Sequence, residues 1–332
     1  MHKDMEILCN IYKKVFGTMS KRQKSKNVVT LIDKLKSIWY NCKDGNREKQ
    51  CGGNMSKSYI VTSFKGGVGK TTLSANLAMS LARRGHKVVA VDCDLESRCL
   101  DIVLGLENAT LFNICDCIKG TCTVDNALVR DTRCENLYFI SAPAFYPERH
   151  EIGTVSESFS QEAINKFVKE LTNRFDYVIF DLPARPDNLY RNLALLVDAA
   201  FVVSLHTAAS IRAAEKTAIA LNELTGYGSD NMTAGGLDIR LIVNGFKCKD
   251  AKQGINVGLY DIISKTKLRL WGVVPFSVSM SKAQEMGKLA HEIYNGTTPF
   301  CRAVENIASR CEGYKVPLFS GVDTGVKKKQ VF

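Results

Sequence analysis

The chain has 332 residues, of which 45% are hydrophobic and 24% charged, a composition typical of a globular protein. No run approaches the roughly 18 apolar residues of a membrane-spanning helix, and no signal-peptide core follows the N-terminus, so we expect neither a membrane-spanning nor an exported protein. The twelve cysteines are scattered, and we interpret them as free thiols in a reducing cytoplasm. The tightest group, Cys115, Cys117 and Cys122, lacks the C-x-x-C spacing of a structural metal site.

The first 54 residues differ from the rest in charge. They hold 12 Lys and Arg against 5 Asp and Glu, which accounts for +7 of the net charge of +11. Basic amphipathic periodicity in this extension would suit an anionic membrane surface or a groove in a partner. Two alternatives are a solvated extension of marginal helicity and translation from Met55, since the codons of 52–54 can spell a ribosome-binding site. We divide the chain into this extension (1–54), a folded domain (55–312) and a tail (313–332).

From residue 59 onward, apolar strand-like runs alternate with segments of helical periodicity. Strands are predicted over 59–63, 88–92, 137–141, 176–181, 199–205, 239–244 and 271–274. Helices are predicted over 70–84, 98–105, 111–119, 157–174, 189–197, 211–225, 256–266, 281–291 and 299–311. Several strands are apolar throughout, which is typical of parallel strands buried on both faces. The pattern predicts an α/β fold with a doubly wound, mostly parallel sheet covered by helices on both faces.

One stretch carries the strongest chemical signal. Residues 63–72 read SFKGGVGKTT and lie between the first predicted strand and the first predicted helix. Glycines allow successive backbone N–H groups to converge on a phosphate, and the helix N-terminus adds a positive dipole. Lys70 is predicted to reach the β- and γ-phosphates and Thr71 to ligate Mg²⁺. This stretch therefore predicts a nucleoside-triphosphate site, with Phe64 where a first glycine is usual.

Carboxylates end two of the predicted strands. Asp92 and Asp94 follow the apolar run 88–91, and Asp181 follows the run 177–180. In a parallel sheet these strand ends meet at the edge where ligands bind. One carboxylate of the first pair can support Mg²⁺ while the other faces an attacking water, and Asp181 can serve as the second magnesium-side carboxylate.

Two later strand ends are weaker candidates for contacts with the base. Asn244 ends the run 242–243, where its amide could read an adenine edge. Pro275 ends the run 272–274 and could wall the base from the other side. An ordinary Asn turn and an ordinary Pro turn are the alternatives at these two positions.

The loop with a second lysine, Lys65, ahead of its glycines resembles the deviant Walker A motif of the MinD/ParA ATPases. Segments that include 91–105, 111–129, 135–142 and 210–212 extend this resemblance over most of 57–290, and they are most similar to the MinD branch. The resemblance implies a P-loop ATPase in which Lys65 reaches across a nucleotide-sandwich homodimer to the phosphates of the partner.

The resemblance also assigns roles. It implies an enzyme that hydrolyses ATP with Mg²⁺ as cofactor, slowly and under stimulation by an unidentified activating protein. The implied role is intracellular positioning at a division site, flagellum or secretion apparatus. The implied catalytic residues are Lys65, Lys70 and Asp94, and the implied metal residues are Thr71, Asp92 and Asp181. The implied nucleotide contacts are Lys65, Gly66, Gly67, Val68, Gly69, Lys70, Thr71, Thr72, Asn244 and Pro275.

Three features depart from the family pattern. Arg185 stands where the family has a switch glycine, and Glu96 replaces a small residue. The tail ends KKKQVF, too short for a stable membrane-binding helix, so a solvated tail is favoured over contact with a membrane. We expect a cytoplasmic protein, peripheral at most at the inner face of the cell membrane.

Rival functions remain. One alternative is a ParA-like partition ATPase, which would bind DNA. The net charge of only +4 over 55–332 gives no specific indication of DNA binding. A non-hydrolysing nucleotide-dependent scaffold is motivated by Arg185 and Glu96. An iron–sulfur carrier is disfavoured by the absence of the cysteine pair, and a tyrosine autokinase by the absence of a terminal tyrosine cluster.

Overall fold

The computed structural model describes residues 56–107, 109–144, 156–226, 236–293 and 296–318. The predicted extension 1–54 and residues 319–332 of the predicted tail lie outside the described residues. Among the helices that are described, none combines the length and apolar character needed to cross a membrane.

The described residues form an eight-stranded sheet with the order β3-β4-β2-β5-β1-β6-β7-β8. The short edge strand β3 runs antiparallel to β4, and the other neighbours pair in parallel. The strands span Lys57–Thr62 (β1), Val88–Asp92 (β2), Val129–Arg130 (β3), Leu137–Ile140 (β4), Tyr177–Asp181 (β5), Ala199–Ser204 (β6), Asp238–Phe246 (β7) and Arg269–Pro275 (β8). The predicted α/β doubly wound sheet is confirmed.

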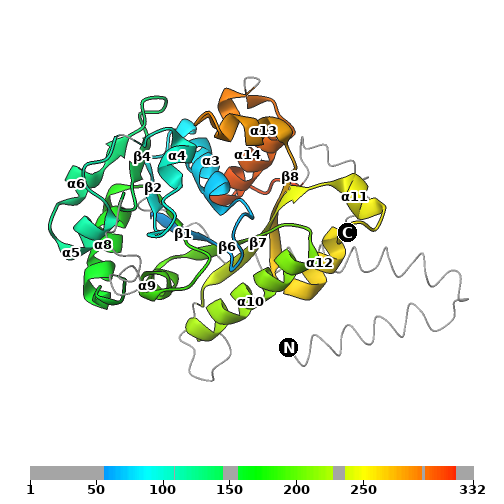
Figure 1. Ribbon diagram of the computed structural model, residues 1–332, viewed down its shortest axis with the longest axis horizontal. Helices are drawn as coiled ribbons and strands as arrows, with labels where there is room; N and C mark the ends of the chain where they lie inside the picture. Colours follow the sequence, from blue (N-terminus) through cyan, green and yellow to red (C-terminus); the bar gives the residue numbers. More distant parts are fainter. Residues whose placement is uncertain (1–55, 108, 145–155, 227–235, 294–295, 319–332) are drawn as a thin grey trace, which may run out of the picture. The chain divides into compact units, whose positions relative to one another are not determined.

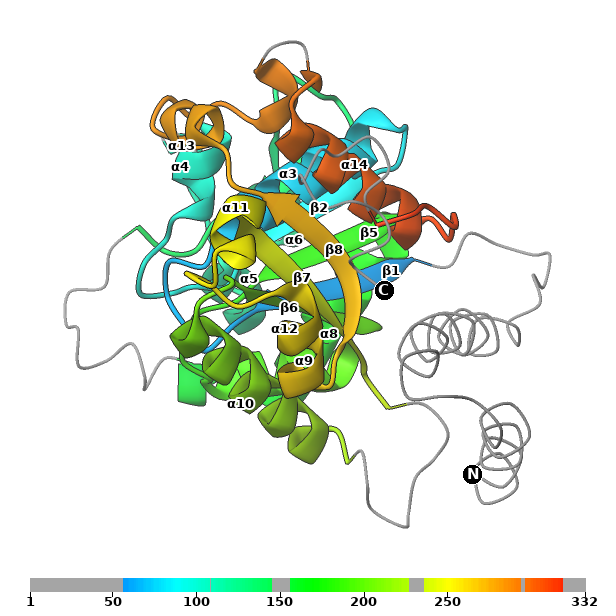
Figure 2. The same cartoon turned by 90° about the vertical axis from the view of Figure 1, so that its right-hand side faces the viewer.

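Helices cover both faces of this sheet, as Figures 1 and 2 show. One face carries α3 (Lys70–Arg83), α4 (Leu100–Leu104), α13 (Val278–Gln284), the 3₁₀ helix η1 (Ala290–Glu292) and α14 (Pro299–Cys311). The other carries α5 (Ile114–Lys119), α6 (Val124–Ala127), α8 (Gln161–Arg174), α9 (Asn188–Leu196), α10 (Ala208–Leu224), α11 (Cys248–Lys252) and α12 (Leu259–Thr266).

The apolar runs form a core on each side of the sheet. In β5, Tyr177 and Ile179 pack into the core shared with α3 and α14, whereas Val178 and Phe180 pack into the core shared with α8 and α9. All five residues of β5 are buried, because successive strand side chains point to opposite faces and helices cover both. Burial on both faces therefore explains why the sequence of β5 is apolar at successive positions and does not alternate with polar residues.

The structure corrects several predicted elements. The predicted helix 281–291 is wrong as a single element, because α13 ends at Gln284 and η1 begins at Ala290. The break includes Gly287, which has a φ of 61° and would bring a Cβ within 3.0 Å of the Cα of Gly105. The short elements β3, α6 and α11 were not predicted, since two to five residues carry little periodicity.

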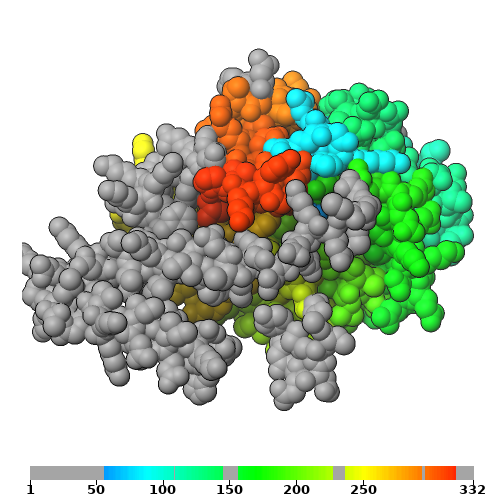
Figure 3. Space-filling view, turned by 180° about the vertical axis from the view of Figure 1, so that it is seen from behind, coloured from blue at the N-terminus to red at the C-terminus, as the bar shows by residue number. Residues whose placement is uncertain are grey.

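The end of α3 is tied to α14 by charge. Arg84 forms ion pairs of 2.7 Å with Glu305 and with Glu312, and His86 lies 2.8 Å from Glu312. In Figure 3, the red surface of α14 borders the cyan surface of the segment that follows α3. These contacts fix the C-terminal end of the helix whose N-terminus follows the glycine-rich loop.

Candidate nucleotide site

The glycine-rich loop runs from the end of β1 at Thr62 to the start of α3 at Lys70. Gly67 and Gly69 have φ values of 71° and 90°, a region that L-residues rarely occupy. Gly69 is the N-cap of α3, and no side chain caps the first N–H groups of this helix. The backbone thus leaves several N–H donors and the positive end of the helix dipole for an anion, which is the phosphate cradle predicted from the sequence.

Distant elements hold this loop in place. The side-chain amide of Asn244, on β7, donates a hydrogen bond of 2.8 Å to the carbonyl oxygen of Val68, which is buried. The backbone N–H of Phe64 donates to the hydroxyl of Thr217, on α10, at 3.0 Å. Asn244 therefore positions the phosphate loop itself, a role that its prediction as an adenine contact did not include. The contact of Thr217 with the loop was not predicted, because no motif in the sequence around Thr217 indicates it.

Replacing Gly69 with Ala should destabilise the protein and weaken nucleotide binding at least tenfold. An added Cβ would lie 2.2 Å from Nδ2 of Asn244. Holding an alanine at a φ of 90° would lower the stability of the folded protein by a further ~1–2 kcal/mol. Gly85→Ala is the matched control, because Gly85 has a φ of 92° and its Cβ would meet no atom within 4 Å. Chemical denaturation and titration with a fluorescent ATP analogue measure both effects. Equal nucleotide affinity in the two variants would contradict the packing argument.

Asp92 and Asp181 lie side by side at the carboxyl ends of β2 and β5, where they are paired in register. Both are buried. Asp92 accepts hydrogen bonds of 3.0 Å from the N–H groups of Asp94 and Leu100, and Asp181 accepts one of 2.8 Å from the hydroxyl of Ser74. The structure thus brings together two carboxylates that are 89 positions apart in the chain.

Burial sets the charge state of this pair. It raises the pKa of Asp92 well above its ordinary value, with the nearby Asp181 as a second cause. Burial also raises the pKa of Asp181 to about 6, although hydrogen bonds from Thr71 and Ser74 and the charge of Lys70 act in the opposite direction. Adjacent buried carboxylates with the hydroxyl of Thr71 offer hard oxygen ligands and an excess of negative charge. These residues fit a Mg²⁺ ion.

Substituting Asp181 with Asn should stabilise the magnesium-free protein at pH 8 and remove the stabilisation that Mg-ATP provides. The pKa of Asp181 rises from 3.8 to about 6 on folding, so the folded chain binds more protons and its stability falls as pH rises through this range. The full shift corresponds to about 3 kcal/mol.

Urea denaturation of the Asp181→Asn variant at pH 5 and pH 8, with EDTA and then with Mg-ATP, measures this effect. Asp261→Asn, at an exposed position on α12, should change the free energy of unfolding by less than about 0.5 kcal/mol. A loss of stability in Asp181→Asn that is equal at both pH values would contradict the prediction.

Asp94 begins the loop that follows β2 and is partly exposed. Its carboxylate accepts a hydrogen bond of 3.0 Å from the N–H of Ser97. Arg98 closes this loop with an unusual φ of 39°, and its guanidinium donates to Asp101 at 2.6 Å. Asp94 is therefore held at the strand end beside Asp92, where a polar side chain can face solvent and substrate.

The remaining predicted residues lie around the same edge of the sheet. Lys65 is partly exposed, and its ammonium forms no hydrogen bond or ion pair with another described residue. Pro275 is buried at the end of β8. Gln284, at the end of α13, donates a hydrogen bond to the hydroxyl of Thr72, although 212 positions separate the two residues. No sequence signal marked Gln284 as a neighbour of the phosphate loop.

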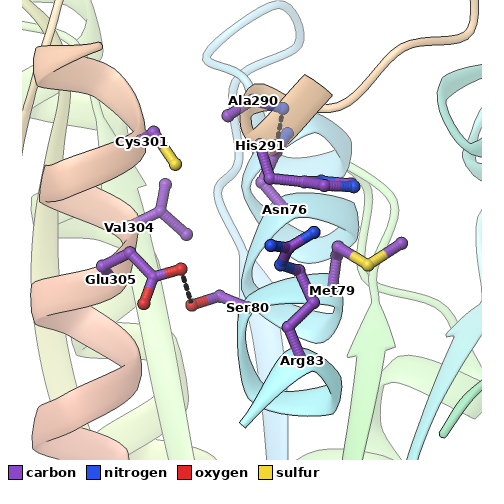
Figure 4. Close-up of a pocket in the computed structure, with 9 residues that line it drawn as sticks. All are labelled: Asn76, Met79, Ser80, Arg83, Ala290, His291, Cys301, Val304 and Glu305. Atoms are coloured by element: carbon purple, nitrogen blue, oxygen red, sulfur yellow. Dashed lines mark hydrogen bonds between the residues drawn. The ribbon is translucent and has the colours of Figure 1, made fainter. Parts of the chain in front are cut away.

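Two other features of the described residues lie apart from this site. A cavity of about 10 Å³, room for about one water molecule, lies between α3, η1 and α14 (Figure 4). Its lining includes Cys301 and His291, whose buried Nδ1 has no hydrogen-bond partner in the structure. No group of three or more His, Cys, Asp or Glu suited to a metal occurs among the described residues, and none of the nine described cysteines is in a disulfide.

A family model described as an AAA domain matches residues 56–224. The septum site-determining protein MinD of Thermotoga maritima is 34% identical over 264 residues, which cover 80% of this chain and 91% of that protein. The MinC:MinD cell division protein complex of Aquifex aeolicus has a TM-score of 0.67 at 29% identity, covering 79% of this chain and 98% of that chain. The chain belongs to the MinD/ParA family of P-loop ATPases.

Membership of the MinD/ParA family confirms the resemblance carried by the loop at 63–72. The MinD of Pyrococcus horikoshii, whose structure is complexed with Mg-ADP, shares the fold with a TM-score of 0.64 at 21% identity, covering 78% of this chain and 96% of that chain. In this MinD/ParA ATPase, the start of α3, which follows the glycine-rich loop, and the carboxylates of β2 and β5 lie together at one edge of the sheet.

Proposed function

We propose that the chain binds Mg-ATP, forms a homodimer around the nucleotide and hydrolyses ATP as a switch in placing the division site. The observation that carries this proposal is the glycine-rich loop beside the buried Asp92–Asp181 pair, a phosphate cradle next to a site for a divalent cation. Similarity to septum site-determining relatives at 34% identity supports the role in division.

Each residue of the site has a distinct task in this proposal. The N–H groups of 66–70 and the ammonium of Lys70 would hold the phosphates, and Thr71, Asp92 and Asp181 would hold Mg²⁺. When bound there, this ion would supply positive charge next to the phosphates. Asp94 orients the water that attacks the γ-phosphate, and Lys65 of the opposite protomer adds positive charge where negative charge develops.

Arg185 bears on the rate of this reaction. It is exposed in the segment between Asp181 and α9, where family members have a switch glycine, and Glu96 is exposed in the loop after β2. An arginine at this position would either contact phosphate itself or damp the switch and slow hydrolysis. The same two residues favour the second candidate function, a scaffold that binds ATP without turnover.

We further propose that the protein acts in the cytoplasm and is at most peripheral at the inner face of the membrane. The similar MinD of Aquifex aeolicus is in a MinC:MinD cell division protein complex, which supports a protein partner for this chain. Binding to DNA is less favoured than binding to a membrane surface, because the chain outside residues 1–54 has a net charge of only +4.

Phosphate release and sedimentation velocity of the full chain, with ATP and with ADP, test the proposal. We expect a dimer with ATP, a monomer with ADP, and slow release of phosphate. Co-sedimentation of the protein with anionic vesicles, and in a parallel experiment with DNA, shows which of the two it binds. Retention on DNA that requires ATP and disappears at high salt would favour a partition ATPase, and ATP binding with no phosphate release would favour the scaffold.

A further inference from the structure

The C-terminal end of α5 folds the chain back on itself. Gly120 ends the helix with a φ of 73°, and its N–H donates to the carbonyl oxygen of Cys117 at 3.1 Å. The next two N–H groups, of Thr121 and Cys122, both point at the carbonyl oxygen of Asp116, at 3.0 and 3.4 Å. This left-handed turn places residue 122 against the last turn of α5.

The turn brings two thiols into contact. The Sγ atoms of Cys117 and Cys122 lie 3.6 Å apart, and both side chains are half-buried against the apolar core. A disulfide has an S–S length of about 2.05 Å, so the sulfurs need to approach by about 1.5 Å. Rotation about the two Cα–Cβ bonds can supply an approach of this size without unfolding α5.

The two thiols are not equivalent. Burial raises the pKa of both. The hydrogen bond between them, in which either sulfur can be the donor, raises the pKa of Cys117 further and acts to lower that of Cys122. Cys122 is the less buried of the two thiols and therefore the one that a peroxide reaches more easily, and Cys117 lies 3.6 Å from it.

We propose that Cys117 and Cys122 are a redox modification site that closes to an intramolecular, reversible disulfide in the presence of a peroxide. The thiolate of Cys122 attacks one peroxide oxygen and breaks the O–O bond, which gives a sulfenic acid and a hydroxide, and the hydroxide takes up the proton that the Cys122 thiol released to become the first water. The sulfur of Cys117 then attacks the sulfenic sulfur and releases a second water. Two thiols lose two protons and two electrons in total, and one hydrogen peroxide is reduced to two waters.

The site is independent of nucleotide chemistry. Ile114 and Ile118 of α5 pack into the core on the α8 side of the sheet, whereas α3, which follows the phosphate loop, packs on the opposite side. The disulfide would fasten the end of α5 to the turn that leads to α6. Its formation can succeed or fail whatever the outcome of the ATPase experiments.

Peptide mapping tests the proposal directly. Trypsin cuts after Arg98, Lys119 and Arg130, so Cys122 is the one cysteine of peptide 120–130. After brief treatment with hydrogen peroxide and alkylation of remaining thiols, we expect peptides 99–119 and 120–130 joined by a disulfide, with fragmentation placing the link at Cys117. Dithiothreitol should restore two alkylatable thiols. The linked species should be abolished by Cys117→Ser and by Cys122→Ser, and should persist in Cys99→Ser.

Phenylarsine oxide provides a second measurement that involves no oxidation. It condenses with two neighbouring thiols, forming two As–S bonds and releasing one water. We expect peptides 99–119 and 120–130 to be bridged by one phenylarsenic group in the wild type and unbridged in Cys122→Ser. Alkylated Cys122 after peroxide treatment, a link from Cys122 to Cys99 or Cys115, or a link to a second chain on a non-reducing gel would overturn the proposal.

Discussion

Replacing Lys70 with Ala should abolish measurable binding of Mg-ATP. Lys70 begins α3, directly after the glycine-rich loop, and its charge lowers the pKa of Asp181, so its ammonium acts on the same edge of the sheet as that carboxylate. Charge-assisted hydrogen bonds to phosphate are worth about 1.5–3 kcal/mol each, and losing two of them weakens binding by at least about 100-fold. Isothermal titration of wild type and variant with Mg-ATP measures the loss.

Lys166→Ala is the matched control for Lys70→Ala. Lys166 is an exposed lysine on α8, on the other side of the sheet from α3, so its removal changes the net charge equally without touching the site. We expect unchanged affinity in this control. Binding by Lys70→Ala within a few fold of wild type would contradict the assignment of the loop as the phosphate site.

Replacing Lys65 with Ala should spare nucleotide binding and remove both ATP-dependent dimerisation and hydrolysis. Lys65 is partly exposed, and no other described residue holds its ammonium by a hydrogen bond or ion pair. Such a side chain is available to a second protomer rather than committed to its own pocket. Isothermal titration, sedimentation velocity with ATP, and phosphate release together distinguish these effects. An unchanged rate of hydrolysis would rule out the sandwich arrangement.

A mixing experiment shows which protomer supplies Lys65. Lys65→Ala and Asp94→Ala should each be inactive alone. In a mixed dimer, the Asp94→Ala chain supplies Lys65 to the site of its partner, which keeps Asp94. One of the two sites of each mixed dimer is then complete, so an equimolar mixture should recover activity up to about half of that of the wild type. If Lys65 acted within its own chain, the mixture would stay inactive.

Local chemistry allowed much of the fold and site to be predicted from the sequence. The uniform apolar runs of β2 and β5 identified buried parallel strands, because strands covered on both faces have no polar side. The spacing of glycines, Lys70 and Thr71 predicted a phosphate loop, because that spacing at a strand–helix junction turns N–H groups, an ammonium and a hydroxyl toward one anion. The boundaries of α13 were mispredicted, since the break near Gly287 depends on close contact with Gly105.

The sequence by itself determined which groups could bind a nucleotide, and the tertiary structure decided how they meet. Strand order places β5 between β2 and β1, and this order alone sets Asp181 beside Asp92. The hydrogen bond of Asn244 to the loop spans 176 positions, and no local pattern encodes it. Propensity and spacing act over a few residues, whereas strand pairing and loop support depend on surfaces that exist only after both cores have packed.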